Sequence, residues 1–423
     1  MVVEKKSSLD SQRALSAFIC ALLFFVALNL TLKILPTNQA QMSLCDRYEF
    51  PYHGWSYWSL KAIRDTDPSR SNIVWLGSSL VVAAIAECDA TMANKPLDLC
   101  FYKGAKYFDG AMKERFGRDY NTFDLSTPGQ IPSDAYLTLK AALDSGIKPG
   151  IVIYGIAPRD FIDQTLADPC DTEPFRYLSR LVDIQDCADD LYKTPIAKLD
   201  WTLQQTLPLY GQSAALNATF KTSCANVIEL PLLRATAPFR QRIMDTPIAK
   251  VLPDFQTFDK APGTNFALPA KGRGPFLDNS EDYKNRYRKP DQLKYSVQMR
   301  FFERLVKLCQ SNEIDVIPVN MPITSRNAVL LNDTWQKRYI DDISRICYSH
   351  NVPFLNQCDF AAYSLEDYRD TVHLNAFGAK KFIDRLVERL AKEPRTGRSI
   401  ISAGDPGNRA VASHTEGEVA VIH

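Results

Sequence analysis

Short apolar runs alternate with helical periodicity in two parts of the chain, one before residue 161 and one after residue 295. Apolar runs between turn residues are typical of buried strands, and apolar positions three or four apart predict helices. Strands are predicted at 73–76, 122–125, 150–154, 315–319 and 353–355. Helices are predicted within 131–146, 295–314, 333–352 and 373–393. Helices and strands that alternate in this way favour a mostly parallel sheet covered by helices on both faces.

The sequence therefore predicts an α/β protein with a three-layer α/β/α, flavodoxin-like domain. The domain comes in two halves, 71–161 and 296–392, separated by an insertion or lid at 162–295, where prolines and polar stretches interrupt the pattern. The last residues, 393–423, have neither periodicity nor aromatic side chains, a composition typical of a disordered tail.

The segment 14–36, ALSAFICALLFFVALNLTLKILP, carries no charge before Lys33. A helix of this length would cross a hydrocarbon core of about 30 Å. Basic residues within 1–13 predict a cytoplasmic N-terminus. The remaining chain, joined through a linker at 37–70, would then lie in the periplasm, anchored in the inner membrane by a single pass. A cleaved signal peptide is the alternative, with a weak cleavage candidate at 37–41.

Composition narrows the classes of function. The net charge is +1, which offers no electrostatic footprint for nucleic acid. Nine of the ten cysteines lie outside the predicted membrane helix, and an exported domain permits disulfides. The pairs Cys88–Cys100 and Cys170–Cys187 are close in sequence, but the connectivity stays open. No spacing of cysteines and histidines indicates a metal, and no organic cofactor is indicated.

Three motifs follow predicted strands, at the edge where parallel sheets bind ligands. In GSS (77–79), Ser79 stands at a sharp strand-to-helix turn, although serine is also a common helix cap. In DTVH (370–373), His373 is a candidate base for a serine nucleophile and Asp370 a candidate to orient it, or the stretch is a polar turn. In STPGQ (126–130), the backbone of Gly129 is a candidate oxyanion donor, or part of an ordinary turn.

Together, VWLGSSLV, DLSTPGQ and DTVHLNAFGAKKF resemble the SGNH (GDSL-like) hydrolase superfamily. Ser78 stands where many members have aspartate. The resemblance implies that Ser79 is the nucleophile, His373 the base and Asp370 its orienting acid, with the N–H groups of Ser79 and Gly129 as oxyanion donors. It covers 71–161 and 296–390, and it leaves the insertion out.

One block departs from the superfamily's pattern. Its third block usually carries Gly-x-Asn-Asp after a strand, and here the place reads YGIAPRDF (154–161), without asparagine. Either Arg159 or Asp160 enters the site instead, or one oxyanion donor is missing. Arg159 is a candidate for an anionic group of substrate or partner, with an ordinary salt bridge as the alternative. Asn320, at the end of another predicted strand, is a candidate substitute donor, or a turn residue before Pro322.

A membrane anchor, an outward SGNH-like domain and an altered third block are similar to the alginate O-acetylation proteins and to the D-alanylation protein of teichoic acid synthesis. That similarity implies a membrane-bound O-acyltransferase as partner and a polysaccharide or other envelope polymer as substrate. In the insertion, aromatic side chains are candidates for stacking on sugars, with core packing as the alternative: Trp201, Tyr210, Tyr283 and Tyr287.

The sequence thus predicts a serine esterase or O-acyltransferase that works through an acyl-enzyme. Two alternatives remain open: a non-catalytic SGNH-like scaffold that binds an acyltransferase or glycan, and a lipid esterase tethered by its helix. The choice between water and a sugar as acceptor depends on how dry the site is.

Overall fold

The protein is described by a computed structural model that covers residues 2–34, 55–65, 73–147, 149–166, 169–179, 181–207, 209, 266–393, 396 and 400. The chain forms two compact units. One comprises 1–53 and 186–260, and the other comprises 54–185 and 261–423. The second unit contains the sheet and the candidate site.

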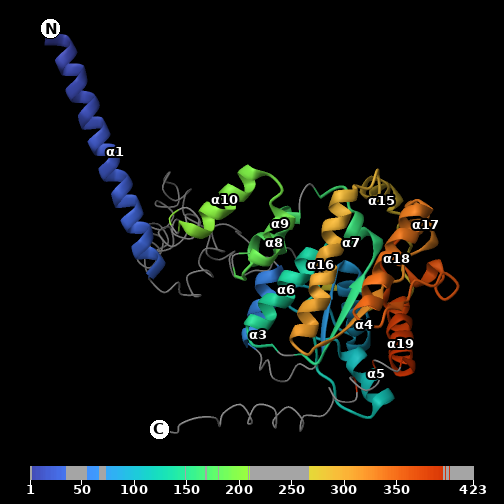
Figure 1. Cartoon of the computed structure of the whole chain (residues 1–423). Helices are drawn as coiled ribbons and strands as arrows, with labels where there is room; N and C mark the ends of the chain where they lie inside the picture. The colour runs from blue at the N-terminus through green and yellow to red at the C-terminus, as the bar shows by residue number, and fades with distance from the viewer. Residues whose placement is uncertain are drawn as a thin grey trace, which may run out of the picture. The chain divides into compact units, whose positions relative to one another are not determined.

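A five-stranded sheet in the order β3-β1-β4-β6-β7 forms the centre of the second unit, and all its pairings are parallel (Figure 1). Its strands are β1 (Ile73–Gly77), β3 (Thr122–Asp124), β4 (Ile151–Ile156), β6 (Asp315–Asn320) and β7 (Leu355–Asn356). The predicted α/β class with a mostly parallel sheet is confirmed. Every residue of β1 and β4 is buried, as expected for central strands covered on both faces.

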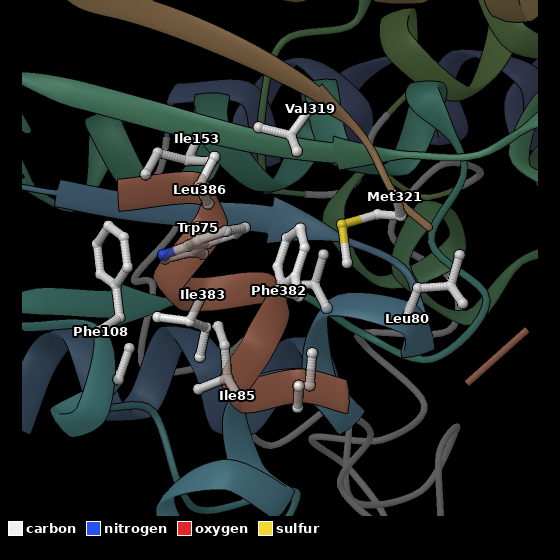
Figure 2. Close-up of a cluster of buried hydrophobic side chains, with 14 of the residues drawn as sticks. Trp75, Leu80, Ile85, Phe108, Ile153, Val319, Met321, Phe382, Ile383 and Leu386 are labelled. Atoms are coloured by element: carbon white, nitrogen blue, oxygen red, sulfur yellow. The ribbon is translucent and has the colours of Figure 1, made fainter. Parts of the chain in front are cut away.

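One face of the sheet packs on three helices that also contact each other: α4 (Ser79–Ala93), α5 (Lys106–Phe116) and α19 (Ala376–Lys392). Figure 2 shows Trp75 of β1 beside Phe382 and Ile383 of α19 and Phe108 of α5. Trp75 and Phe108 meet edge to face, with ring centroids 5.5 Å apart. Burial of each such side chain contributes about 1.5–3 kcal/mol to folding. This core fixes the start of α19, where one of the sequence motifs lies.

The other face packs on α6 (Pro132–Asp144) and α16 (Gln292–Ser311), which contact each other. Tyr154 of β4 stacks on Phe302 of α16 with ring centroids 6.1 Å apart. Further helices on this side and around the strand ends are α7 (Pro158–Ile162), α8 (Glu173–Leu178), α15 (Ser280–Arg286), α17 (Ser325–Ala328) and α18 (Asp333–Ser349). A two-stranded antiparallel pair is formed by β2 (Leu97–Asp98) and β5 (Phe266–Ala267).

Two segments predicted as irregular are partly structured. The predicted linker 37–70 contains α3 (Trp55–Asp65), which packs on α6 and α8 because Trp58, Leu60 and Ile63 are buried. In the predicted disordered tail, Ile400 is 1% exposed within the main core, and its carbonyl accepts a hydrogen bond from Tyr120. The rest of the tail lies outside the described residues, apart from Glu393 and Thr396.

The predicted insertion, 162–295, is divided between the two units. Residues 162–185 and 266–295 belong to the unit of the sheet, whereas α9 (Ala188–Leu191) and α10 (Pro195–Thr206) belong to the first unit. Cys88 and Cys100, one of the two pairs considered from sequence, are both buried free thiols.

The first unit also contains α1 (Val2–Ile34), a helix whose apolar side chains between 15 and 30 are mostly exposed. Within the described part of the chain, no helix has both the length and the apolar character needed to cross a membrane, the property that the sequence predicted for 14–36.

Candidate active site

The turn after β1 presents Ser79 as the first residue of α4. Gly77 has φ +148°, and a Cβ atom there would lie 2.5 Å from Cγ2 of Val81 and 2.7 Å from the carbonyl oxygen of Gly155. Only glycine fits so close to both strand and helix. The first N–H groups of a helix have no partner inside it, so Ser79 stands where partial positive charge gathers.

His373 joins Ser79 to Asp370. Its Nε2 lies 2.9 Å from Oγ of Ser79, and its Nδ1 lies 2.7 Å from Oδ2 of Asp370. The other oxygen of Asp370 accepts from the backbone N–H of His373 at 2.8 Å and of Val372 at 2.9 Å. Burial opposes ionisation of Asp370, but these hydrogen bonds and the imidazole hold its pKa below the usual range. An ionised carboxylate only accepts, so the proton sits on Nδ1 and Nε2 is free to accept from the serine.

The loop that carries His373 is held by its own backbone and by the start of α19. Asn375 accepts from the N–H groups of Phe377 and Gly378, both at 3.1 Å, and donates to the carbonyl of Glu366 at 2.7 Å. A Cβ atom at Gly378 would lie 2.0 Å from the carbonyl oxygen of Asp367, so the helix needs glycine at this approach. The spacing Asp-x-x-His-x-Asn-x-x-Gly therefore has a local structural cause.

Gln130, which the sequence reasoning passed over, connects two of the motifs. Its Oε1 accepts from the N–H of Gly77 at 2.7 Å, and its Nε2 donates to the carbonyl of Leu125 at 3.2 Å. The backbone N–H of Thr127 also donates to the Gly77 carbonyl, at 3.0 Å. The loop of Gly129 is thus fixed directly to the turn that leads to Ser79. The sequence feature that could have indicated this role is the position of Gln130 directly after the Pro-Gly turn of STPGQ.

A cavity of about 370 Å³ opens at Ser79 and His373, and Gly129 and Arg159 also line it. Of the residues predicted from sequence, the structure brings these four together with Asp370. Arg159, directly after β4, donates through Nε to Asp163 at 3.0 Å and through Nη1 to Asp160 at 3.4 Å. The sequence left two alternatives for Arg159, entry into the site or an ordinary salt bridge. In the structure its side chain both lines the cavity and forms ion pairs.

Asp160 lies behind the cavity wall. Its side chain is 2% exposed, and burial raises its pKa to about 6, an effect opposed by Arg159, by the N–H of Ala157 and by a hydrogen bond with Ser78. Ser78, the residue before Ser79, thus contacts a carboxylate of the segment 154–161.

Asn320 does not join the others. At the end of β6 its Oδ1 accepts from the Tyr339 hydroxyl at 3.0 Å, and its Nδ2 donates to Asn356 at 2.9 Å. It lines a second cavity, of about 160 Å³, and is 4% exposed. The substitute donor predicted from sequence is therefore directed away from Ser79, because Tyr339 and Asn356 occupy both ends of its amide.

A different asparagine lines the Ser79 cavity. Asn279, from the predicted insertion, accepts through Oδ1 from the N–H of Thr371 at 3.1 Å and from its hydroxyl. Thr371 lies between Asp370 and His373, and the N–H of Leu277 donates to the Arg369 carbonyl at 2.7 Å. The insertion is thereby fixed to the histidine loop. No sequence pattern indicated this contact, because the segment has no periodicity.

The predicted glycan-stacking aromatics separate into three groups. Tyr283 and Tyr287 line the cavity, with ring centroids 5.8 Å apart. Trp201 stacks on Tyr192 in the other unit, and Tyr210 lies outside the described residues.

Glu87 adds a charged group next to the triad. It forms an ion pair with Arg369, whose Nε lies 4.0 Å from Oδ2 of Asp370, the oxygen that accepts from His373. Burial raises the pKa of Glu87 to about 7; Arg369 lowers it and Asp370 raises it further. Since Glu87 is two turns beyond Ser79 on α4, the pair connects this helix with the loop of His373.

Comparison with models of known protein families and with curated protein sequences gave no match for this chain.

Proposed function

We propose that the chain is a serine-dependent acyl-transfer enzyme, an esterase or O-acyltransferase of the SGNH type. The observation that carries the proposal is the continuous contact from Ser79 through His373 to Asp370, at 2.9 Å and 2.7 Å. Nucleophile, base and orienting acid in hydrogen-bond reach are what serine acyl transfer requires.

In the proposed reaction, Oγ of Ser79 attacks an ester carbonyl while Nε2 of His373 takes its proton. The negative charge that develops on the carbonyl oxygen would be stabilised by the N–H groups of Ser79 and Gly129. Asp370 stabilises the imidazolium, which gives its proton to the departing alcohol. Water or a sugar hydroxyl then attacks the acyl carbonyl, with Nε2 of His373 again taking the proton. His373 returns this proton to Oγ of Ser79 as the bond between Ser79 and the acyl group breaks.

The physiological setting is part of the proposal and rests on the sequence. The similarity to envelope-acylating proteins favours an extracytoplasmic polysaccharide or other envelope polymer as substrate and a membrane-bound O-acyltransferase as partner. The apolar stretch at 14–36, which carries no charge before Lys33, favours anchoring in the inner membrane with the sheet domain in the periplasm. Fractionation of cells that express the full chain or residues 37–423 tests this setting: only the full chain should stay with alkali-washed membranes.

Mass spectrometry of an acyl-enzyme tests the chemistry. The full chain is incubated with 4-nitrophenyl acetate, quenched in acid and digested. An acetyl group should appear on the peptide that contains Ser79, and Ser79→Ala should abolish it. Ser145→Ala is a matched control, because Ser145 ends α6 before the amino end of β4, away from the site. Acetylation that persists in Ser79→Ala at the same rate would contradict the proposal.

A non-catalytic scaffold is the second candidate, and the altered third block favours it. Arg159 replaces the usual amide, and the amide of Asn320 points elsewhere. Ser79→Ala distinguishes the two in cells: a scaffold would support polymer acylation unchanged, and an enzyme would not.

A further inference from the structure

The cavity at Ser79 holds a second group of polar side chains that the acyl-transfer steps do not use. Arg286, at the end of α15, lines it together with Arg159 and Asn279. The carbonyl of Arg286 accepts from the N–H of Gln164, so α15 is fixed to the chain that follows α7.

One buried carboxylate holds both arginines. Oδ2 of Asp163 accepts from Nε of Arg159 at 3.0 Å and from Nη1 of Arg286, and Oδ1 accepts from the N–H and hydroxyl of Thr165 at 2.9 Å and 2.6 Å. Burial opposes ionisation of Asp163, but the arginines and Thr165 lower its pKa. A carboxylate accepts about four hydrogen bonds, so Asp163 is saturated.

The arginines retain donors that Asp163 does not satisfy. Each guanidinium has five N–H groups. Among the described residues, the Nη2 atoms of Arg159 and Arg286 have no hydrogen-bond partner. Arg159 Nη2 lies next to Gly129, since a Cβ atom built on that glycine would lie 3.6 Å from it. Arg286 lies with its guanidinium 5.9 Å from the Tyr283 ring and has a 31% exposed side chain, so a ligand can reach it.

Asn279 adds an oriented amide. A backbone N–H can only donate, so the atom of Asn279 that faces the Thr371 nitrogen is its side-chain oxygen. The Nδ2 of Asn279 takes no part in this contact. Within the described part of the chain this Nδ2 also has no hydrogen-bond partner. Three side chains thus offer unfilled N–H donors to one cavity.

The charges that line the cavity leave an excess of donors. Arg159 and Arg286 are cationic, and His373 already contacts Ser79 and Asp370. Among the residues that the structure describes, the one carboxylate that lines the cavity is Asp282, which is exposed. Asp160 and Asp163 are buried behind the arginines. The cavity volume of about 370 Å³ is in the range of small-ligand pockets. Planar guanidinium groups with spare donors recognise carboxylates and phosphates.

We propose that Arg159, Arg286 and Asn279 form an anion subsite next to Ser79, which binds a carboxylate or phosphate carried by the substrate. This inference deepens the proposed function by naming the class of substrate: an acylated, acidic glycan or polyol rather than a neutral one. Arg286 is its specificity-determining residue, because its side chain is 31% exposed and comes from the insertion, whereas Arg159 is 15% exposed and borders the Gly129 loop.

Binding to the full chain with Ser79→Ala tests the subsite without turnover. The probes are D-glucuronate, D-glucose 6-phosphate and neutral D-glucose, followed by ligand-observed NMR titration. At least one acidic sugar should bind about 10-fold or more tightly than glucose, and comparison of the two identifies carboxylate or phosphate. When Arg286→Gln is added, this preference should disappear. The affinity for the acidic sugar should fall about 10-fold or more, the amount that one charge-assisted hydrogen bond supplies. Arg286→Lys, which keeps the charge but loses the fork, should retain part of it.

Arg326→Gln is the matched control. Arg326 is an exposed arginine of α17 that pairs with Asp278 at 3.4 Å outside the cavity, so the preference should persist. Equal affinity for acidic and neutral sugars, or a preference that survives Arg286→Gln, would overturn the subsite. Since binding does not need Ser79, this failure is distinct from that of the acyl-enzyme experiment: acetylation of Ser79 without anion preference would leave the proposed function standing.

Discussion

Nε2 of His373 lies 2.9 Å from Oγ of Ser79, across 294 positions of chain. The contact exists because β1 and the loop before α19 end at the same edge of a parallel sheet, and because Gly77 and Gly378 permit the close approaches on each side.

This contact predicts that Ser79 and His373 act as one unit. Ser79→Ala and His373→Ala should each lower kcat for an aryl ester by several orders of magnitude, up to about 10⁶-fold as in other serine triads. The double variant should be no slower than either single one, because each loss already stops the proton transfer. Steady-state kinetics of the three variants decide this. Multiplied losses in the double variant would show that the two side chains act independently.

Asp370→Asn should lower kcat by about 10³–10⁴-fold and change KM little. An amide can donate to Nδ1, which favours the tautomer with its proton on Nε2, the wrong one for a base. Asp359→Asn is the control, because Asp359 is a half-exposed carboxylate paired with Arg385 at 3.1 Å. A kcat within 10-fold of the wild type would mean that Asp370 only supports the loop.

Gly77→Ala should destabilise the fold by about 1–3 kcal/mol or more, because its Cβ would overlap Val81 and the Gly155 carbonyl. Gly110→Ala is the matched control, and it is expected to change the stability in the opposite direction. Gly110 is exposed within α5 with no atom near its added Cβ, so the change should stabilise by about 0.5–1 kcal/mol. Urea unfolding measures both. Equal stability of Gly77→Ala and the wild type would be incompatible with this turn.

Glu87 should make stability depend on pH. Its folded pKa of about 7 lies above the 4.5 that is usual for a glutamate in water, so the folded state holds a proton that the unfolded state has released. This contribution is full below about pH 4.5 and is lost as pH rises to about 7. From pH 5 to 7.5, the free energy of unfolding of Glu87→Gln should therefore fall less than that of the wild type. Urea unfolding at both pH values measures the difference, and identical slopes would show that Glu87 is not perturbed.

Much of the sheet could be predicted from the sequence, since buried parallel strands need continuous apolar runs and their helices need apolar faces. The predicted strands at 73–76 and 315–319 match β1 and β6 to within one residue at each end. Ser79 and His373 could be named for a related reason: each lies two residues from a glycine or asparagine that a local turn or helix cap requires, and Asp370 could be named because it precedes His373 by three residues.

Other residues were placed only by the tertiary structure. Gln130 is fixed to the turn at Gly77, and Asn279 and Arg286 reach the cavity, through contacts with distant backbone. Asn320, which stands at a strand end as predicted, is turned away by Tyr339 and Asn356. Ile400 enters the core from a segment without periodicity. Local patterns record which residues a strand, turn or cap needs. They do not record which side chain of an irregular segment will face a cavity, because that depends on packing between segments far apart in the chain.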